Sequence, residues 1–207
     1  MQTGQENAQL SNWPIITKYL VENDDYYISY YSAMRLHGMT THALREAIVT
    51  TPKRRRAKKV SNFSYNFIYT KAEYIWGVEM HWVSQQDNVC ISDLERTLLD
   101  GLARPELCGG IKEIVRGIWV KQEQINWDKV LQYAAKFHTK AAVKRLGFIF
   151  ELLHLGESYV PQLAQITSSA KDYILLDPGS PKTGRYLERW HIRLNVNIEE
   201  LKESIWG

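Results

Sequence analysis

Apolar and polar positions alternate in the first half of the chain in the way typical of β-strands. In residues 63–69 four aromatic residues occupy every second position (Phe63, Tyr65, Phe67 and Tyr69). A period of two predicts a half-buried strand. Residues 78–82 alternate in the same way, and 47–49 and 89–91 are short apolar runs of strand type. Because short connections join these segments, residues 26–91 are predicted to be sheet-rich, with an antiparallel sheet.

Two short helices are predicted near the start of the chain. Ser11 and Pro14 are suited to begin the first, because a proline in the opening turn costs no backbone hydrogen bond. The second begins at Ser29 and ends at His37, where Gly38 follows as a terminator. Residues 1–12 are polar and are expected to form a disordered N-terminal segment.

From residue 92 onward the period changes to that of helices. Ser92 and Glu95 form an S-x-x-E capping box, and apolar stripes predict further helices over 111–119, 127–137, 140–155 and 161–166. Residues 169–207 are mixed, with strands predicted at 173–176 and 186–194 and a last helical turn at 198–204 that Asn197 caps. The pattern predicts an α+β fold in which the antiparallel sheet packs against a C-terminal helical bundle. One domain over 13–207 is favoured, with 92–168 helical; the alternative is a division near residue 91.

The helix that follows residue 92 carries a charged row. Arg96, Asp100 and Arg104 are spaced by four residues, so they share one helix face. The row is either solvated or consists of partly buried partners that lock the sheet to the bundle. The second interpretation is favoured, because strands directly precede this helix and further helices directly follow it.

Composition narrows the class of protein. The chain has 207 residues, of which 44% are hydrophobic, with a mean hydropathy of -0.36 and two cysteines. No window is long and apolar enough to span a membrane, and the polar start lacks the features of a secretory signal. Two cysteines form neither a disulfide framework nor a four-ligand zinc site. A cytoplasmic protein without a membrane partner is therefore predicted.

Basic residues are concentrated in one short segment. Six of the seven residues from 53 to 59 are cations (Lys53, Arg54, Arg55, Arg56, Lys58 and Lys59), between two predicted strands. Such a loop is either simply solvated or binds an anion, and binding of nucleic acid or an acidic partner is favoured. A second row follows the predicted helix 140–155 and forms either a solvent face or a second basic face (Lys136, Lys140, Lys144 and Arg145).

No arrangement of residues in the sequence indicates catalysis. The six histidines are scattered without metal-ligand spacing, and no phosphate-binding glycine loop is present. Arg185 and His191 have the loose R-x5-H spacing of some metal-free ribonucleases, but that chemistry needs a helix where a strand is predicted. We therefore expect no enzyme, no cofactor, no metal and no small-molecule substrate. The alternative is a nucleic-acid-binding or nucleic-acid-processing enzyme that uses the basic loop 53–59.

Several segments occur in a characteristic order between roughly residues 13 and 197: Tyr26-Tyr27-Ile28-Ser29, Ser32-Ala33, Leu36-His37-Gly38, Thr51-Pro52-Lys53-Arg54-Arg55, residues 89–111, Arg145-Leu146-Gly147-Phe148, Leu176-Asp177-Pro178, Gly184, Arg189-Trp190 and Val196-Asn197. Together they resemble the AbiEi family of antitoxins, which belong to bacterial systems of abortive phage infection. Residues 89–111 contain the family signature, to which we assign a structural role (Ser92, Asp93, Glu95, Arg96, Asp100 and Arg104).

The resemblance implies a type IV antitoxin, which opposes a nucleotidyltransferase-like toxin encoded beside it without a stable complex. Members also act as DNA-binding transcriptional regulators of their own operon, usually through an N-terminal winged helix-turn-helix. The resemblance here begins near residue 13 and corresponds to the C-terminal antitoxin domain. We therefore expect antitoxicity from this chain, and operator recognition is not carried over.

Overall fold

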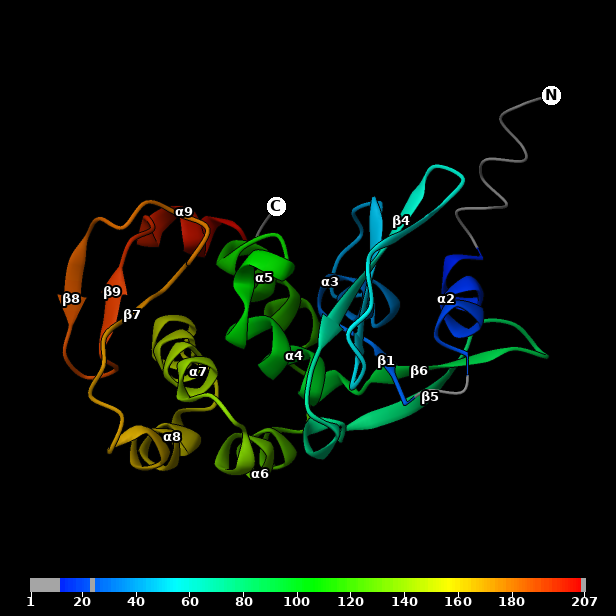
Figure 1. The fold of residues 1–207 in the computed structure, drawn as a ribbon. Coiled ribbons are helices and arrows are strands. Elements are labelled where there is room, and N and C mark those ends of the chain that lie inside the picture. The colour runs from blue at the N-terminus through cyan, green and yellow to red at the C-terminus, as the bar shows by residue number, and fades with distance from the viewer. Residues whose placement is uncertain (1–11, 23–24, 206–207) are drawn as a thin grey trace. The chain divides into compact units, whose positions relative to one another are not determined.

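The computed structural model describes residues 12–22 and 25–205, which form two compact units (Figure 1). Unit 1 contains the described residues up to Leu36 together with Thr41–Asp93, and unit 2 contains His37–Thr40 and the described residues from Leu94 onward. The chain passes from sheet to helices at Asp93, close to the alternative division near residue 91, and each unit encloses apolar residues of its own. The segment expected to be disordered, apart from Asn12, lies outside the described residues.

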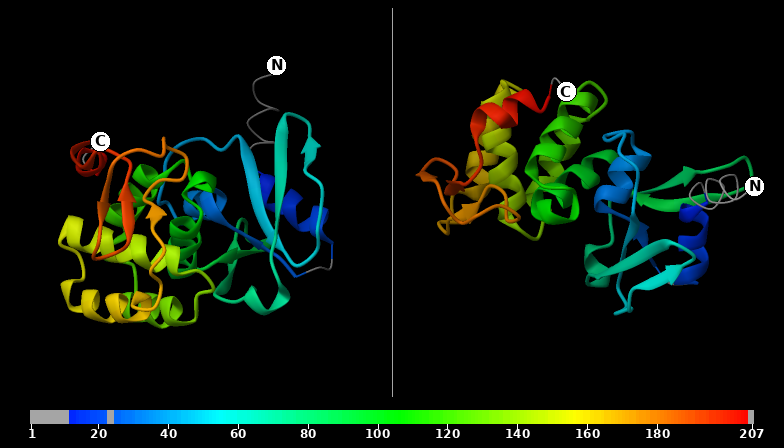
Figure 2. Two further views of the ribbon diagram at one scale, coloured as in Figure 1. Left: turned by 60° about the vertical axis from the view of Figure 1, so that its left-hand side comes forward. Right: turned by 90° about the horizontal axis from the view of Figure 1, so that it is seen from above.

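Unit 1 is a six-stranded sheet with helices on both faces. The helices are α2 (Trp13–Val21), α3 (Tyr30–Leu36) and the short 3-10 helix η1 (Ala72–Tyr74). Figures 1 and 2 show α2 and α3 on opposite faces of the sheet. The strands are β1 (Tyr27–Ile28), β2 (Glu46–Thr51), β3 (Lys58–Val60), β4 (Phe63–Tyr69), β5 (Val78–Trp82) and β6 (Asn88–Ser92).

The sheet is mixed, whereas an antiparallel sheet was predicted. Its strand order is β3-β4-β2-β1-β6-β5, and the pairs β2–β4 and β1–β6 are parallel. The seven-residue β4 takes the inner place beside β2, and the short β3 is displaced to the edge. Because β4 returns from β3 by a tight hairpin, it runs in the same direction as β2. Local alternation predicts strands but does not reveal this insertion.

The core of unit 1 lies between α2 and the sheet. Trp13 of α2 stacks on Phe63 of β4 with 6.1 Å between the ring centroids. The cluster of buried residues comprises Trp13, Ile28, Ala47, Phe63, Tyr65, Val89 and Ile91. The half-buried strand predicted at 63–69 is thus confirmed. Burial raises the pKa of Tyr65 to about 12, and its hydroxyl has no hydrogen-bond partner among the described residues.

The alternating apolar residues of β5 are not buried in the way that those of β4 are. The strand is present, but Met80 and Trp82 are 56% and 62% exposed. These side chains point to the face on which α3 packs, yet α3 lies against β2 in the middle of the sheet and β5 is an edge strand. An apolar period of two therefore does not ensure burial at a sheet edge.

Unit 2 contains the predicted helices and a second, smaller sheet, so the α+β class is confirmed. Its helices are α4 (Leu94–Ala103), η2 (Pro105–Leu107), α5 (Ile111–Lys121), α6 (Trp127–Lys136), α7 (Lys140–Leu153), η3 (Glu157–Tyr159), α8 (Val160–Thr167) and α9 (Ile198–Glu203). Ten of the 14 residues of α7 are buried, so this helix forms the centre of the unit. Among the described residues, no helix is long and apolar enough to cross a bilayer.

The small sheet packs against α7. Its strands are β7 (Ile174–Leu175), β8 (Arg185–Leu187) and β9 (Ile192–Leu194), in the order β7-β9-β8. The turn between β8 and β9 holds Trp190, whose Nε1 donates to Glu151 Oε2 at 2.7 Å. A Cβ on Gly147 would overlap the Trp190 ring, so only glycine permits this approach. The single strand predicted over 186–194 is therefore two strands joined by a turn.

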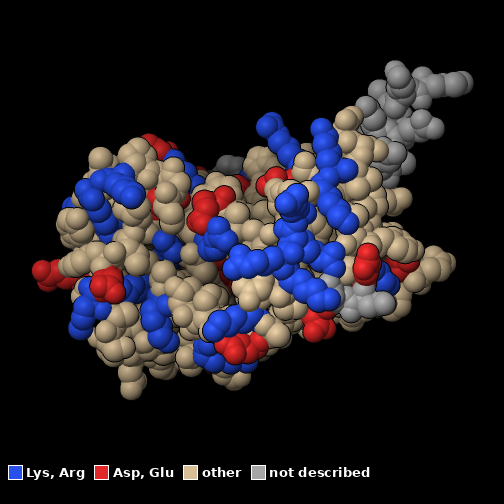
Figure 3. Space-filling model, viewed as in Figure 1, with Lys and Arg blue, Asp and Glu red and all other residues tan. Residues whose placement is uncertain are grey.

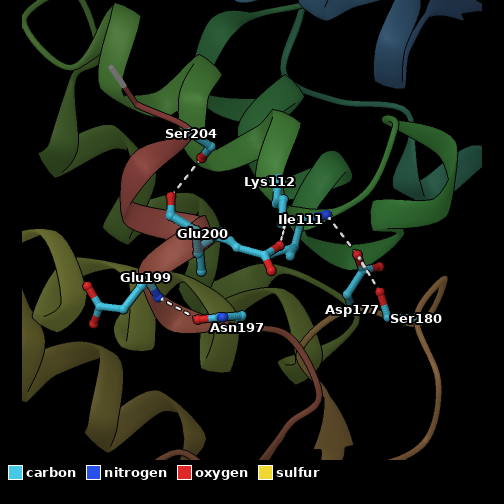
Figure 4. Close-up of polar contacts among 9 residues, drawn as sticks. Ile111, Lys112, Asp177, Ser180, Asn197, Glu199, Glu200 and Ser204 are labelled. Carbon is cyan, nitrogen blue, oxygen red and sulfur yellow. Dashed lines mark hydrogen bonds and ion pairs between the residues drawn. The ribbon is translucent and has the colours of Figure 1, made fainter. Parts of the chain in front are cut away.

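Polar contacts connect α5 to the turn that follows β7 and to α9 (Figure 4). The buried Asp177 carboxylate accepts from Ile111 N–H at the start of α5 and from Ser180 Oγ, each at 3.4 Å. Lys112 of α5 forms an ion pair with Glu200 of α9. Asn197 caps α9 as predicted, because its side chain accepts from Glu199 N–H at 2.9 Å.

Candidate nucleic-acid interface

The basic segment, residues 53–59, joins β2 to β3 at one edge of the unit 1 sheet. Residues 53–57 form the predicted connection. Lys58 and Lys59 belong instead to β3, where they pair with Tyr65 and Ser64 of β4. The pairing holds these two cations in an extended backbone, so only part of the segment is a loop.

One cation of the segment, Arg55, joins it to α2. Its Nη1 and Nη2 donate to Leu20 O and Val21 O, both at 3.0 Å. These carbonyls belong to the last turn of α2, where backbone acceptors lack helical partners and a positive charge is favourable. Arg55 is partly buried, and we assign it the role of fixing the connection rather than contacting a ligand.

The other five cations are exposed at the surface of unit 1 (Lys53, Arg54, Arg56, Lys58 and Lys59). The Arg54 guanidinium lies 4.6 Å from the centroid of the Tyr69 ring. Tyr69 is the last residue of the alternating strand and is 47% exposed. Figure 3 shows Lys and Arg side chains gathered over the part of the molecule that carries β2–β4. Contacts to phosphates carry no information about base sequence by themselves, so such a surface is not suited to reading sequence.

The second basic face that the sequence predicted is not formed by its four members. Lys144 and Arg145 are 2% and 3% exposed. Arg145 donates to Leu102 O and Leu175 O at 2.7 Å and to Leu176 O at 2.9 Å. Lys144 Nζ donates to Asp172 O at 2.5 Å.

Arg145 therefore acts as a structural cross-link within unit 2. Burial lowers its pKa to about 10, and carbonyl oxygens from α4 and β7 satisfy its donors. Of the remaining two predicted members, Lys136 is exposed and lies 4.8 Å from the Tyr133 ring, and Lys140 is partly exposed. These two cations alone do not make an extended basic face.

The signature residues have structural positions. Arg96 Nε and Asp100 Oδ1 form an ion pair at 2.8 Å, with side chains 2% and 3% exposed. The burial predicted for these two partners is confirmed. Arg104 does not join the row, because the helix ends at Ala103 and Arg104 pairs with Glu106 at the surface. Asp93 is buried directly before α4.

Ser92 and Glu95, for which the sequence predicts a capping box, contact neighbouring elements. Ser92 ends β6, and its hydroxyl donates to Ile28 O at 3.5 Å. Glu95 contacts α6: its carboxylate pairs with Lys129 at 2.8 Å and accepts from Asn126 N–H at 2.9 Å. Burial acts to raise the pKa of Glu95, but the hydrogen bonds from Lys129 and Asn126 outweigh it, and the pKa is lowered.

The two cysteines have thiols with raised pKa values. Burial raises the pKa of the Cys108 thiol well above its usual range, and burial also raises the pKa of Cys90. A raised pKa reduces the fraction of nucleophilic thiolate. In residues 12–22 and 25–205 no group of three His, Cys, Asp or Glu side chains could hold a metal ion.

Comparisons with known proteins bear on the fold. No family model and no curated protein matches the chain. The crystal structure of the RV2827C protein from Mycobacterium tuberculosis is similar, with a TM-score of 0.67 and 11% sequence identity. The similarity covers 95% of this chain and 71% of that one. At this identity the likeness concerns the fold alone.

Proposed function

We propose that this chain is a non-enzymatic antitoxin that contacts the phosphate backbone of nucleic acid through the basic segment. The proposed nucleic-acid contact rests on one observation: the cations of that segment have two different environments. Arg55 is tied to the end of α2, while five neighbouring cations are exposed on the same edge of the sheet. A fixed connection presents these charges without first having to be ordered, which lowers the entropic cost of binding.

The antitoxin part of the proposal rests on the resemblance to the AbiEi family over residues 13–197. Its functional partner is a nucleotidyltransferase-like toxin encoded by a neighbouring gene, and both proteins act in the cytoplasm. The buried Arg96–Asp100 pair and the Glu95–Lys129 contact support a structural role for the signature residues. The proposed contact with nucleic acid is assigned to the basic segment and not to the signature residues.

The nucleic-acid contact is tested by binding of a fluorescent 20-base-pair duplex at several salt concentrations. Arg54→Gln/Arg56→Gln removes two exposed cations, and Arg35→Gln/Arg45→Gln is the matched control, because it removes two exposed arginines from the same unit. If both target arginines contact phosphates, the slope of log K against log salt becomes less negative by about 1.8. An unchanged slope, or the same change in the control, contradicts the contact.

Antitoxicity is tested by growth rescue. The neighbouring nucleotidyltransferase-like protein is induced in cells with and without this chain, and rescue is the expected result. Absence of rescue with both proteins folded and expressed refutes the antitoxin role. If the Arg54→Gln/Arg56→Gln variant also rescues growth, antitoxicity does not depend on these two cations of the basic segment. Magnesium-dependent cleavage of labelled RNA or DNA by the purified chain would favour a nucleic-acid-processing enzyme instead.

A further inference from the structure

The small sheet of unit 2 carries a cluster of aromatic and cationic side chains. Tyr173 and Tyr186 form an edge-to-face pair with 4.9 Å between ring centroids. His191 lies 5.2 Å from the Tyr173 ring, and the Arg193 guanidinium lies 5.3 Å from the Tyr186 ring. We call these four residues the tyrosine face.

The strand register explains why these residues share one face. Tyr186 of β8 pairs with Arg193 of β9, and Leu175 of β7 pairs with the same arginine. Tyr173 and His191 directly precede β7 and β9, and the ring contacts of Tyr173 with Tyr186 and with His191 place both residues beside this face. Ile192 points to the opposite side and is buried.

The two tyrosines are accessible to a ligand. Tyr173 is 43% exposed and Tyr186 is 57% exposed. Arg193 Nε has no hydrogen-bond partner among the described residues, and the contact described for its guanidinium is the Tyr186 ring. Two exposed aromatic rings with a stacked arginine form a platform of the kind on which unpaired bases stack.

The surrounding segment has the charge that such a ligand needs. Residues 171–193 contain five Lys or Arg and three Asp or Glu. One of the three acids, Asp177, already accepts hydrogen bonds from Ile111 and Gly179 N–H groups. Lys171 is exposed and stands two residues before Tyr173. An anionic ligand is thus favoured over a basic or apolar one as the partner of this face.

We propose that the tyrosine face binds single-stranded nucleic acid. Bases stack on Tyr173 and Tyr186, and Lys171 contacts a phosphate. A duplex does not provide these contacts, because its bases are stacked on one another and only their edges are accessible. This second site lies in unit 2 and is independent of the duplex contact proposed for the basic segment in unit 1.

The test is fluorescence anisotropy with labelled U12 and dT12 single strands and a labelled 12-base-pair duplex. Tyr173→Ala/Tyr186→Ala should bind both single strands at least about tenfold more weakly, because each tyrosine removed takes away a base-stacking platform. Tyr173→Phe/Tyr186→Phe keeps the rings and should stay within about twofold of wild type. Tyr19→Ala is the matched control, since Tyr19 is 73% exposed in unit 1.

Photo-crosslinking of the unmodified protein to a 5-iodouridine strand provides a second measurement that does not depend on the variants folding. The expected cross-linked peptides contain Tyr173 or Tyr186. Absence of these peptides, no binding of single strands by wild type, or equal weakening on the duplex would overturn the proposal. A protein partner that binds the tyrosine face while single strands do not would overturn it as well. If the duplex test refutes the contact proposed for the basic segment, the expected single-strand result for the tyrosine variants does not change. The two proposals can therefore be refuted separately.

Discussion

Replacing Arg96 with alanine tests the assignment of the signature helix most directly. The Arg96–Asp100 pair is 2.8 Å long, and its side chains are 2% and 3% exposed. The Arg96 guanidinium also lies 5.1 Å from the Phe137 ring. Alanine would leave the Asp100 carboxylate buried without this partner and would remove the contact with the ring.

The expected loss follows from this burial. Removing one member of a buried pair costs about 3–5 kcal/mol, whereas an exposed pair contributes about 0–1 kcal/mol. Arg104→Ala is the matched control, because Arg104 pairs with Glu106 at the surface, with side chains 44% and 38% exposed. We expect Arg96→Ala to lower the free energy of unfolding by at least about 3 kcal/mol and Arg104→Ala by less than about 1 kcal/mol.

The assay is urea unfolding followed by circular dichroism at 222 nm, because most helices belong to unit 2. Hydrogen exchange of peptides from α4 and α7 assigns the loss to this unit. Arg96→Met/Asp100→Leu removes both charges and should recover most of the stability. A loss of only a few tenths of a kcal/mol in Arg96→Ala would refute the buried-pair account.

Three further substitutions test other parts of the fold by the same unfolding measurement. Gly147→Ala should cost at least about 2 kcal/mol, because its Cβ overlaps the Trp190 ring; a neutral result would place the ring elsewhere. Tyr65→Phe should raise the free energy of unfolding by about 1 kcal/mol, since it removes a buried hydroxyl that has no hydrogen-bond partner among the described residues. A clearly lower free energy of unfolding would mean that the hydroxyl forms a hydrogen bond. Glu95→Gln should cost about 1–2 kcal/mol at pH 7. A lowered folded-state pKa means that Glu95 stabilises the fold above its ordinary pKa of 4.5 and loses this effect as pH falls through the folded value, so the gap to wild type should close in acid. A gap that stays constant down to pH 3 would contradict the Lys129 contact.

The local pattern of apolar and polar residues predicts most of the helices and strands, and the predictions that are wrong share one cause. The cations at positions 144 and 145 resemble a solvent face, because spacing along a helix does not report what packs on it. Arg145 is buried because its donors meet carbonyls of Leu102 and Leu175, which lie 43 and 30 residues away in sequence. The candidate interface was predicted in outline, but the role of Arg55 depends on the end of α2. No local signal brings Tyr173, Tyr186 and Arg193 together.

The sequence by itself determined most of the strand and helix segments, the α+β class and the site of concentrated positive charge. These properties depend on periods of two or 3.6 residues and on residue type, which act over a few neighbouring positions. Only the tertiary structure decided the parallel strand pairs, the burial of Arg145 and the tyrosine face. Each of these requires segments far apart in the chain to meet, and that meeting is governed by how whole faces pack and how buried polar groups find partners.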